Sequence, residues 1–379
     1  MNRTGKFLFL FFALISSCVA ARAQTPQSYV SCIVYSATFC PYGAFSNTNL
    51  GGYPLISVAG YHQPGDGGGG TLTLQSGSCM PNGGSIIQDN ARNCFSRINS
   101  TWSQKEFGAY SDGVTAHDDT TALQNWFNAT QPHIAVPGNS IVSATLTCPS
   151  NATIQGPSNL AGQGTPVFVI TATSAIFTGS SVIAADASCR ISGVGIDANG
   201  RADAVDVLGT HVTIDGFSEL KNGFPYDLKC NVGSGSVYGL QKKNVELDSA
   251  WTDGIHITGS CHDVRLIEDL VSGAGKSGSG SGISFAGGEG TISGGVIQES
   301  AGIGLDLAGA DRVSVTAEHI QGNGRGASGG AGIRINNSNT IAISGNHLEG
   351  NGGFETGSAQ ILFAGTSDNI NIGTNVYAP

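Results

Sequence analysis

Gly254-Ile255-His256-Ile257 is the first of four similar tetrapeptides in this chain. The other three, whose glycines follow at spacings of 28, 22 and 28 residues, are Gly282-Ile283-Ser284-Phe285, Gly304-Leu305-Asp306-Leu307 and Gly332-Ile333-Arg334-Ile335. Each is followed, nine or ten residues after its glycine, by a second segment in which apolar residues alternate with others. Repeats this short cannot bury an apolar face alone, so they must stack on one another. The pattern therefore predicts an all-β solenoid, a parallel β-helix.

The first 23 residues have the features of a cleavable signal peptide. Arg3 and Lys6 precede an apolar run from Phe7 to Ile15, and Ala21-Arg22-Ala23 follows as a cleavage site. We therefore expect an exported protein, secreted or periplasmic, with lipid attachment at Cys18 as the alternative. The apolar run is shorter than the roughly 20 residues that a transmembrane helix needs, and no later stretch approaches that length. No transmembrane segment is expected.

The cysteines point to disulfide bonds. Nine occur in the chain, and removal of Cys18 with the signal peptide leaves eight. An even number in an exported chain favours disulfides. Cys32 with Cys40 and Cys79 with Cys94 are suited to local pairing, whereas the full connectivity stays open. There is no Cys-x-x-Cys pair and no Cys/His cluster at zinc spacing, which makes a structural metal site the weaker interpretation of these sulfurs.

The composition is rich in glycine and poor in charge. Glycine accounts for 57 of 379 residues and charged residues for 12%, so long helices are not expected. A formal net charge of -10 predicts repulsion of nucleic acids and anionic membrane surfaces. An acidic ligand would have to meet a local basic patch.

The mature chain divides into two predicted parts. Residues 24–104 form a Cys/Gly-rich module of short strands and turns, and residues 105–379 form the β-helix. A short helix is expected after Asp118 or Asp119, either of which can cap it. Its apolar face consists of Leu123, Trp126 and Phe127. We expect this helix to close one end of the stack.

Three motifs occur in order ahead of the repeats. They are the Gly-rich segment from Gly60-Tyr61 to Gly70, then Phe107-Gly108-Ala109-Tyr110-Ser111-Asp112-Gly113-Val114-Thr115 with Asp118-Asp119-Thr120-Thr121-Ala122-Leu123-Gln124, and finally Val136-Pro137-Gly138 leading to Ile154-Gln155-Gly156. Together they resemble the pectate-lyase-like superfamily, which includes polysaccharide lyases, polygalacturonase-type hydrolases, uronan epimerases and phage tailspikes. Over residues 58–379 the resemblance implies a single-stranded right-handed parallel β-helix that handles a polysaccharide. The reaction stays open, because the same opening precedes many chemistries. The oligomeric state also stays open, although trimers are common among tailspikes.

The middle residue of each tetrapeptide should point to solvent, because alternate side chains of a strand face opposite ways. Aligning the repeats predicts an outward ladder of Asp206, Tyr238, His256, Ser284, Asp306, Arg334 and Leu362. Coils in such a stack are about 4.8 Å apart, so His256 should lie between Tyr238 and Ser284. Asp306 and Arg334 should occupy adjacent coils.

The polar members of this ladder suit removal of the proton next to a uronate carboxyl group. That reaction needs a base, a proton donor and neutralisation of the carboxylate. We expect His256 or Tyr238 to take the C5 proton, the other to deliver a proton, and Arg334 to bind the carboxylate, with Asp306 beside it. Loss of a leaving group would make the protein a lyase, and reprotonation would make it a C5-epimerase. The set is similar in kind to the sites of uronan lyases and epimerases in the superfamily.

Hydrolysis is the rival reaction. Trp251-Thr252-Asp253-Gly254-Ile255 resembles the Asn-Thr-Asp-Gly element of polygalacturonases. The next coil has Gly282-Ile283-Ser284-Phe285 where that family has two aspartates, and no Gly-His-Gly follows. Glycoside hydrolysis requires two carboxyl groups roughly 5 to 10 Å apart. Asp206 and Asp306 lie several coils apart in the predicted ladder, so a turn residue such as Asp253 would have to complete a pair.

Six further residues are candidate substrate contacts. They are Asp253, Trp251, Lys242, Lys243, Arg265 and Ser284. Trp251 can stack on a sugar ring or pack against the neighbouring coil. The three basic residues can form a patch that attracts carboxylates, or can lie on the solvated surface as most lysines do.

No cofactor is assigned from the sequence. Asp253, Glu246 and Asp248 could bind Ca²⁺ near such a site, but no Asp-rich loop with fixed ligand spacing is present. Two non-catalytic interpretations stand beside the enzymatic ones: a tail-fibre-like module that only binds glycan, and a disulfide-stapled structural solenoid. The outer surface of any β-helix is polar, so a mixed ladder also arises without a function.

Overall fold

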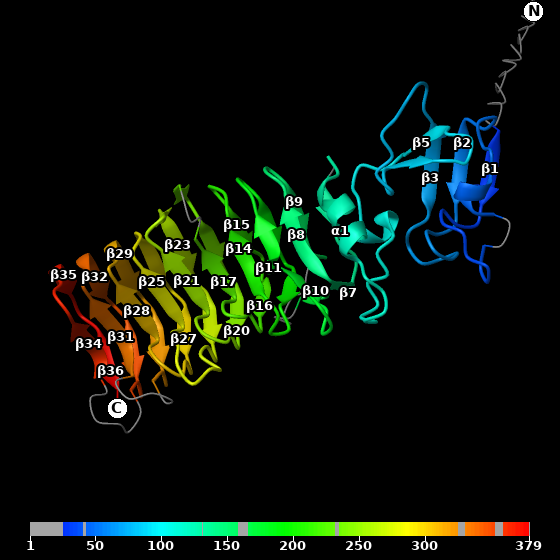
Figure 1. The fold of residues 1–379 in the computed structure, drawn as a ribbon. Helices are drawn as coiled ribbons and strands as arrows, with labels where there is room; N and C mark the ends of the chain where they lie inside the picture. The colour runs from blue at the N-terminus through cyan, green and yellow to red at the C-terminus, as the bar shows by residue number, and fades with distance from the viewer. Residues whose placement is uncertain are drawn as a thin grey trace, which may run out of the picture.

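The computed structural model describes residues 26–40, 43–130, 132–157, 166–231, 235–324, 330–352 and 359–378. The predicted signal peptide and Cys18 lie outside these residues. Most of the described chain winds into a right-handed parallel β-solenoid, which confirms the predicted fold class. Figure 1 shows this solenoid as a long stack of strands, with the N-terminal module at one end and the C-terminus at the other.

Three long parallel sheets form the walls of the solenoid (Figure 1). Sheet I contains β7 (Gly138–Val142), β10 (Phe168–Ala172), β13 (Gly195–Asp197), β16 (Glu219–Lys221), β20 (Glu246–Asp248), β24 (Leu270–Ser272), β27 (Val296–Gln298), β30 (His319–Gln321), β33 (His347–Glu349) and β36 (Val376–Ala378). Sheet II contains β8 (Ala144–Cys148), β11 (Thr178–Ala185), β14 (Asp203–Val207), β17 (Leu228–Cys230), β21 (Ile255–Thr258), β25 (Ile283–Ala286), β28 (Leu305–Ala308), β31 (Ala331–Asn336) and β34 (Ala359–Ala364). Sheet III contains β6 (His133–Ile134), β9 (Thr153–Gln155), β12 (Arg190–Ser192), β15 (Thr213–Asp215), β19 (Gln241–Lys243), β23 (Val264–Ile267), β26 (Gly290–Ser293), β29 (Asp311–Thr316), β32 (Asn339–Ser344) and β35 (Asp368–Ile372). A separate short pair consists of β18 (Val237–Tyr238) and β22 (Cys261–His262).

Apolar side chains from the three sheets point inward and form one continuous core. In sheet II, Ile255 lies opposite Ile283 of the next strand, and both are almost completely buried. The tetrapeptides begin with glycine because the corner leaves no room for a side chain. A Cβ on Gly282 would lie 2.7 Å from Ile297 Cγ2 and 2.8 Å from the carbonyl oxygen of Gly304.

Four disulfide bonds join the cysteines of the described chain. They are Cys32–Cys40, Cys79–Cys94, Cys148–Cys189 and Cys230–Cys261. The first two are the local pairs that the sequence predicted. The other two begin at the ends of β8 and β17 and tie consecutive segments of the solenoid together, which restricts the unfolded chain and stabilises the fold.

A small five-stranded sheet precedes the solenoid. In spatial order its strands are β1 (Gln27–Val30), β2 (Leu55–Val58), β3 (Gly70–Leu74), β5 (Cys94–Arg97) and β4 (Ile86–Gln88), with the 3-10 turns η1 (Phe45–Asn47) and η2 (Gln104–Phe107) beside it. This module has its own core, built around Phe45, Ile56, Leu72 and Phe95.

The α-helix α1 (Thr120–Phe127) lies between this module and the first coils of the solenoid (Figure 1). The three apolar residues assigned to its inner face are buried, as predicted. Asp119 occupies the N-cap position but makes no side-chain capping hydrogen bond to the helix, while Asp118 Oδ1 accepts a hydrogen bond from Thr120 N at 3.0 Å. Asp119 instead accepts two backbone hydrogen bonds from the preceding loop. Within the described ranges no helix is long and apolar enough to cross a membrane.

Candidate active site

The outward ladder of sheet II runs through the centres of successive strands. In the observed register it consists of Asp206, Lys229, His256, Ser284, Asp306, Arg334 and Leu362. Six of these seven are the residues that the sequence predicted. His256 and Arg334 therefore lie on the same wall of the solenoid, as the tetrapeptide pattern required.

Tyr238 is the exception, and its predicted place in the ladder is wrong. It lies on β18, opposite His262 of β22, and its ring stacks on that of His262 with centroids 5.0 Å apart. Lys229 is the neighbour of His256 on that side. The tetrapeptide of this coil is Asp227-Leu228-Lys229-Cys230, in which Asp replaces the leading glycine and Cys replaces the second aliphatic residue. These replacements made the repeat unrecognisable.

His256 is oriented by two neighbours. Its Nδ1 lies 3.0 Å from Asp253 Oδ2, while Asp253 Oδ1 accepts a hydrogen bond from Ser281 N at 2.8 Å. The ring of Tyr226 stacks on the imidazole, with centroids 4.4 Å apart and planes 11° from parallel. The His256 side chain remains 19% exposed, so it is reachable from solvent. A carboxylate that accepts the Nδ1 proton leaves Nε2 as the basic nitrogen, which is the arrangement of an oriented general base.

The sequence analysis missed Tyr226, although a positional signal exists. Tyr226 precedes Lys229 by three residues, as Asp253 precedes His256 by three residues. The two strands are in register, so these preceding residues form a second column beside the ladder. Burial raises the pKa of the Tyr226 hydroxyl, and the negative charges of Asp253 and Asp203 raise it further. Tyr226 therefore keeps its proton near neutral pH and can act as a hydrogen-bond donor.

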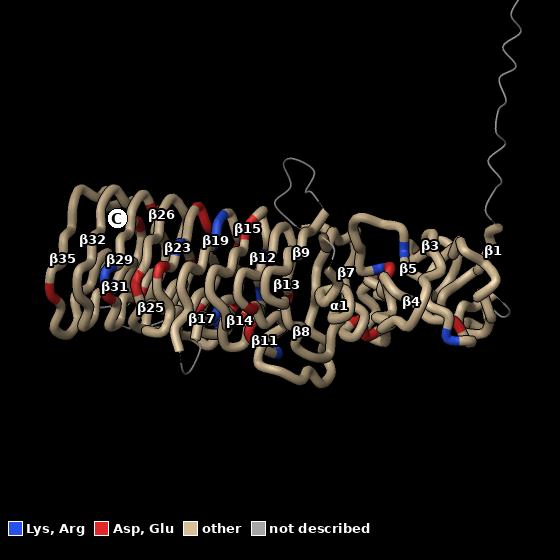
Figure 2. The backbone as a smooth tube through the Cα atoms, turned by 90° about the horizontal axis from the view of Figure 1, so that it is seen from above, with Lys and Arg blue, Asp and Glu red and all other residues tan. Residues whose placement is uncertain are grey.

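Two acids of β14 surround Lys229. Its Nζ lies 3.4 Å from Asp203 Oδ2 and 3.8 Å from Asp206 Oδ1. Figure 2 shows acidic and basic residues close together around β14 and β17. Burial raises the pKa of Asp203 to about 7, and the negative charge of Asp206 adds to this effect. Asp203 can therefore carry a proton near neutral pH.

Arg334 and Asp306 occupy adjacent strands, as predicted, and bind each other. Arg334 Nε donates to Asp306 Oδ1 at 2.8 Å, and Arg334 Nη2 donates to Asp306 Oδ2 at 2.6 Å. This bidentate pair uses the face of the guanidinium that would grip a substrate carboxylate. Ser284, which is almost completely buried, lies between His256 and Asp306 in the ladder.

The predicted basic patch does not form. Lys242 is fully buried, and its Nζ lies 3.0 Å from Asp269 Oδ2, so it cannot meet a ligand at the surface. In β19 the side chain of Lys242 points into the core, whereas that of Lys243 points out. Lys243 and Arg265 are exposed on sheet III, a different wall from that of His256.

The remaining candidate contacts lie at the corner that leads into β21. Trp251 is 46% exposed and packs against Phe224 with ring centroids 5.6 Å apart, so half of its surface is open. Asp253 is engaged by His256, while Glu246 and Asp248 lie on β20 of sheet I. These three acids do not form a metal-binding group among the described residues.

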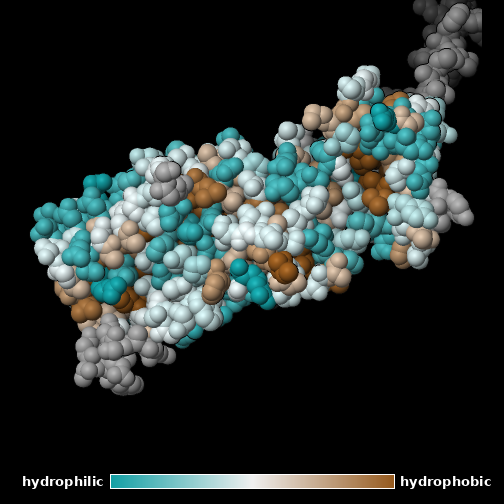
Figure 3. All heavy atoms as spheres, viewed as in Figure 1, coloured by the Kyte–Doolittle hydropathy of each residue, from teal (hydrophilic) through white to brown (hydrophobic). Residues whose placement is uncertain are grey.

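A cleft of about 650 Å³ lies at the junction between the N-terminal module and the solenoid. His117 and His62 both stack on Tyr110, at centroid distances of 3.9 and 4.0 Å, and all three line the cleft with Tyr35 and Phe39. Apolar side chains gather on this part of the surface, between the module and α1 (Figure 3).

The cleft also holds a histidine–carboxylate pair, with His117 Nδ1 2.8 Å from Asp112 Oδ2, but these two side chains are 38% and 40% exposed. On sheet II the acid paired with the histidine, Asp253, is buried, and β14 adds two more buried acids. We therefore regard the outer face of sheet II as the candidate active site.

Comparisons with known proteins identify the fold. No protein-family model matches the chain, and no match is found among curated proteins. Among solved structures, tailspike protein 4 of bacteriophage CBA120 matches with a TM-score of 0.59, 13% identity and coverage of 91% of this chain and 52% of that one. Tailspike protein 2 of the same phage, described as an enzymatically active domain, matches with a TM-score of 0.58, 15% identity and coverage of 85% and 50%.

A third structure extends the comparison to another phage. Tailspike gp49 of the Acinetobacter baumannii bacteriophage Fri1, described as a capsular polysaccharide depolymerase, matches with a TM-score of 0.53, 12% identity and coverage of 93% of this chain and 75% of that one. The chain spans about half the length of the two CBA120 tailspikes. The present chain therefore shares the parallel β-helix fold of these tailspikes, in agreement with the fold implied by its resemblance to the pectate-lyase-like superfamily.

Proposed function

We propose that this chain is an exported enzyme that acts on an acidic polysaccharide, with its active site on sheet II at β14, β17 and β21. The observation that carries the proposal is the His256–Asp253 pair, 3.0 Å apart, with Tyr226 stacked on the imidazole. The shared fold with enzymatic tailspikes supports a polysaccharide as substrate. Four disulfides support export, because such bonds persist in oxidising compartments.

The proposed reaction begins with proton abstraction from C5 of a uronate residue. His256 Nε2 takes the proton, and Asp253 stabilises the imidazolium that forms. Lys229 lies one strand away and neutralises the uronate carboxylate, on which the negative charge develops. This assignment replaces Arg334 because Lys229 is the in-register neighbour of His256, whereas Arg334 lies three strands away. Lys229 would exchange its ion pairs with Asp203 and Asp206 for the substrate carboxylate.

Two outcomes follow from the same first step. In a lyase, the electron pair of the C5–H bond forms a C4=C5 double bond, the C4–O bond breaks, and Tyr226 protonates the leaving oxygen. In a C5-epimerase, Tyr226 returns a proton to the opposite face of C5 and no bond of the chain breaks. Ser284, Asp306 and Arg334 continue the same polar wall and are proposed to contact neighbouring sugar residues.

Hydrolysis is the second candidate, for which Asp203 on β14 is the potential acid. Asp203, with a pKa of about 7, can protonate the glycosidic oxygen. Asp206 is hydrogen-bonded to Asp203 and therefore closer than the roughly 5 to 10 Å that hydrolysis requires, so a turn residue such as Asp253 would have to act as base or nucleophile. The reaction would use the same face of sheet II but would not need His256.

One assay set separates these reactions. The untagged protein is incubated with a panel of uronans, and three signals are recorded: absorbance of unsaturated ends, deuterium incorporation at C5 from heavy water, and new reducing ends. We expect either unsaturated ends or deuterium incorporation at C5. This signal should vanish in His256→Ala and persist in His211→Ala, a control at an exposed histidine.

Other results would overturn the primary proposal. Reducing ends without unsaturation or exchange, lost in Asp203→Asn, would establish hydrolysis. Glycan retention without any product, unchanged in a His256→Ala/Arg334→Ala variant, would establish a non-catalytic binding module.

A further inference from the structure

Two histidines and one glutamate converge on the outer face of sheet I, away from the candidate active site. His319 begins β30 and His347 begins β33, and the two strands pair so that these histidines lie opposite each other. Their rings are stacked, with centroids 4.7 Å apart and planes 11° from parallel. Glu349 lies two residues after His347 on the same strand, and its side chain therefore points to the same side.

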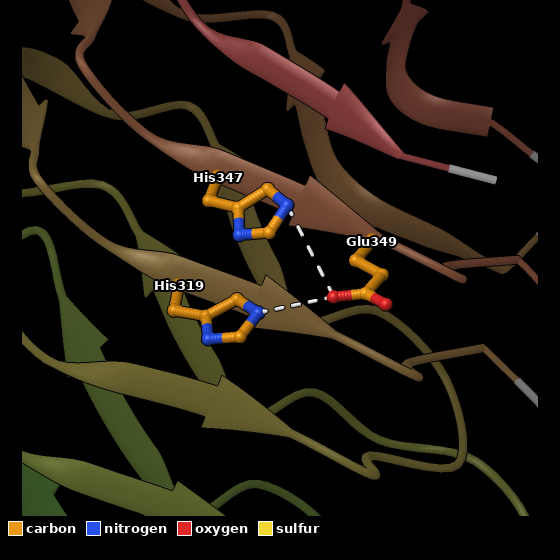
Figure 4. Close-up of side chains that lie close together, drawn as sticks. All are labelled: His319, His347 and Glu349. Carbon is orange, nitrogen blue, oxygen red and sulfur yellow. Dashed lines mark ion pairs between the residues drawn. The ribbon is translucent and has the colours of Figure 1, made fainter.

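Figure 4 shows both imidazoles directed at the carboxylate of Glu349. Glu349 Oε2 lies 3.5 Å from His319 Nε2 and 4.0 Å from His347 Nε2. The three ligand atoms all lie within 4.8 Å of one another. A tetrahedral site with metal–ligand bonds of about 2.0 to 2.1 Å places its ligand atoms about 3.4 Å apart. The side chains are thus nearly at the separation that one shared cation would impose.

The contacts within this cluster leave one ligand atom unsatisfied. His319 Nε2 is shielded from solvent and has no hydrogen-bond partner in the described part of the chain. A buried polar atom without a partner is unfavourable, so such atoms in native structures call for an explanation. A cation between the two nitrogens and the carboxylate would satisfy all three groups at once.

The surroundings single out these two coils. His319 and His347 belong to a column of in-register residues that crosses sheet I. In this column the neighbouring strands β27 and β36 contribute Val296 and Val376. In the column of Glu349, Gln321 is engaged with Gln298, to which it donates a hydrogen bond of 2.8 Å. The adjacent strands β24, β27 and β36 carry no charged residue, so the cluster is separated from the charged residues that sheet I has on β16 and β20.

We propose that His319, His347 and Glu349 form a binding site for a first-row divalent transition metal, with Zn²⁺ as the expected ion. Two imidazoles and one carboxylate form a ligand set that zinc sites use, with the fourth position left to water. Ca²⁺ and Mg²⁺ prefer all-oxygen sites, so they fit this set poorly. The ion would link two successive coils near the C-terminal end of the solenoid. This inference does not depend on the proposed reaction, whose residues lie on sheet II.

The sequence could not reveal this cluster by motif. Its two histidines are 28 residues apart, one turn of the solenoid, which matches no zinc-binding spacing. Only the pairing of β30 with β33 brings them together.

The test uses untagged full-length protein, stripped with a chelator and dialysed, and titrated with ZnCl₂ in a calorimeter. We expect one Zn²⁺ per chain, a higher Tm for the loaded protein, and visible absorption bands of a low-symmetry site when Co²⁺ is used instead. In His319→Ala/His347→Ala the affinity should fall by about 100-fold or more, and in Glu349→Gln by about 10-fold or more. These side chains point outward, so the core is untouched.

A matched control comes from a histidine–carboxylate pair that lacks a second imidazole. His262 Nδ1 lies 3.4 Å from Glu289 Oε1, and His262→Ala should bind Zn²⁺ like the unaltered chain. The proposal is overturned if the unaltered chain takes up no Zn²⁺, if uptake survives in the double variant, or if His262→Ala loses it equally. If circular dichroism shows that the double variant does not fold, the Zn²⁺ affinity of the near-isosteric Glu349→Gln variant tests the proposal instead.

Discussion

His256 Nδ1 faces Asp253 Oδ2 at 3.0 Å across the corner that leads into β21, three residues apart in the chain. Both residues are held by the solenoid itself: His256 by its pairing between Lys229 and Ser284, and Asp253 by the hydrogen bond from Ser281 N. The orientation of the imidazole is therefore built by neighbouring coils rather than by a mobile loop. Such rigid support is what a general base needs.

The first prediction concerns this pair. Asp253→Asn keeps an acceptor for Ser281 N but removes the charge that fixes the His256 tautomer and stabilises the imidazolium. We expect kcat on the responsive uronan to fall by about 100- to 10,000-fold, with a small change in KM. Asp368→Asn, an exposed acid on β35, serves as control. Unchanged kcat in Asp253→Asn would contradict the assignment of His256 as an Asp-oriented base.

The second prediction distinguishes two tyrosines. Tyr226→Phe retains the ring that stacks on His256 but removes the proton donor, so we expect kcat to fall by about 100-fold or more while Tm is unchanged. Tyr238→Phe should leave kcat unaltered, because Tyr238 stacks on His262 in a separate pair of strands. The measurement is the initial rate of each variant at saturating substrate. Loss of activity in Tyr238→Phe alone would contradict the assignment of Tyr226 as the proton donor.

The sequence predicted which residues lie on the outer face of sheet II more accurately than it predicted their chemical roles. The Gly-apolar-x-apolar pattern identified the register of His256, Ser284, Asp306 and Arg334 because each middle residue must point outward if its neighbours fill the core. It failed at Lys229, where a cysteine serves as a core residue and joins a disulfide. A pattern based on aliphatic residues alone cannot recognise a buried cysteine.

Contacts that depend on the corners could not be predicted. Tyr226 and Asp253 precede their strands, and their meeting with His256 depends on how each corner turns. Lys242 was assigned to the surface because buried lysines are rare, yet Asp269 from the next coil neutralises it inside the core. Tyr226 with His256, and Lys242 with Asp269, are each about one coil apart in sequence, where periodicity predicts proximity but not side-chain direction.

The third prediction concerns Asp203 and pH. Its pKa of about 7 in the folded chain lies above the ordinary 3.8 because burial disfavours the charged form. Between about pH 4 and pH 7, Asp203 is deprotonated in the unfolded chain but keeps its proton in the folded chain. The contribution of Asp203 to stability is therefore complete below about pH 4 and is lost as the pH rises through 7. At about 1.4 kcal/mol per pKa unit, the loss amounts to about 4 kcal/mol at most.

Asp203→Asn removes this titration while keeping an acceptor for the backbone of Tyr226. We expect the variant to have a higher Tm than the unaltered chain at pH 8 and a similar Tm at pH 4. Thermal unfolding followed by circular dichroism at both pH values measures the difference, with Asp368→Asn as the exposed control. A Tm difference of the same size at both pH values would show that Asp203 is ionised throughout.

The last prediction uses two neighbouring lysines of β19. Lys242 is fully buried, with Nζ 3.0 Å from Asp269 Oδ2, whereas Lys243 is half exposed, with Nζ 3.7 Å from Glu268 Oε2. Lys242→Met retains an apolar stem of similar length but leaves the Asp269 carboxylate buried without its cation, so the free energy of unfolding should fall by about 3–5 kcal/mol. Lys243→Met should change it by less than about 0.5 kcal/mol.

Urea unfolding of both variants at neutral pH measures these changes. The deficit of Lys242→Met should shrink as the pH falls, because an unpaired Asp269 in the core can then take up a proton and lose its charge. Losses of equal size in the two variants would contradict the inward direction of Lys242. A large loss in Lys243→Met alone would mean that β19 presents its opposite face to the core.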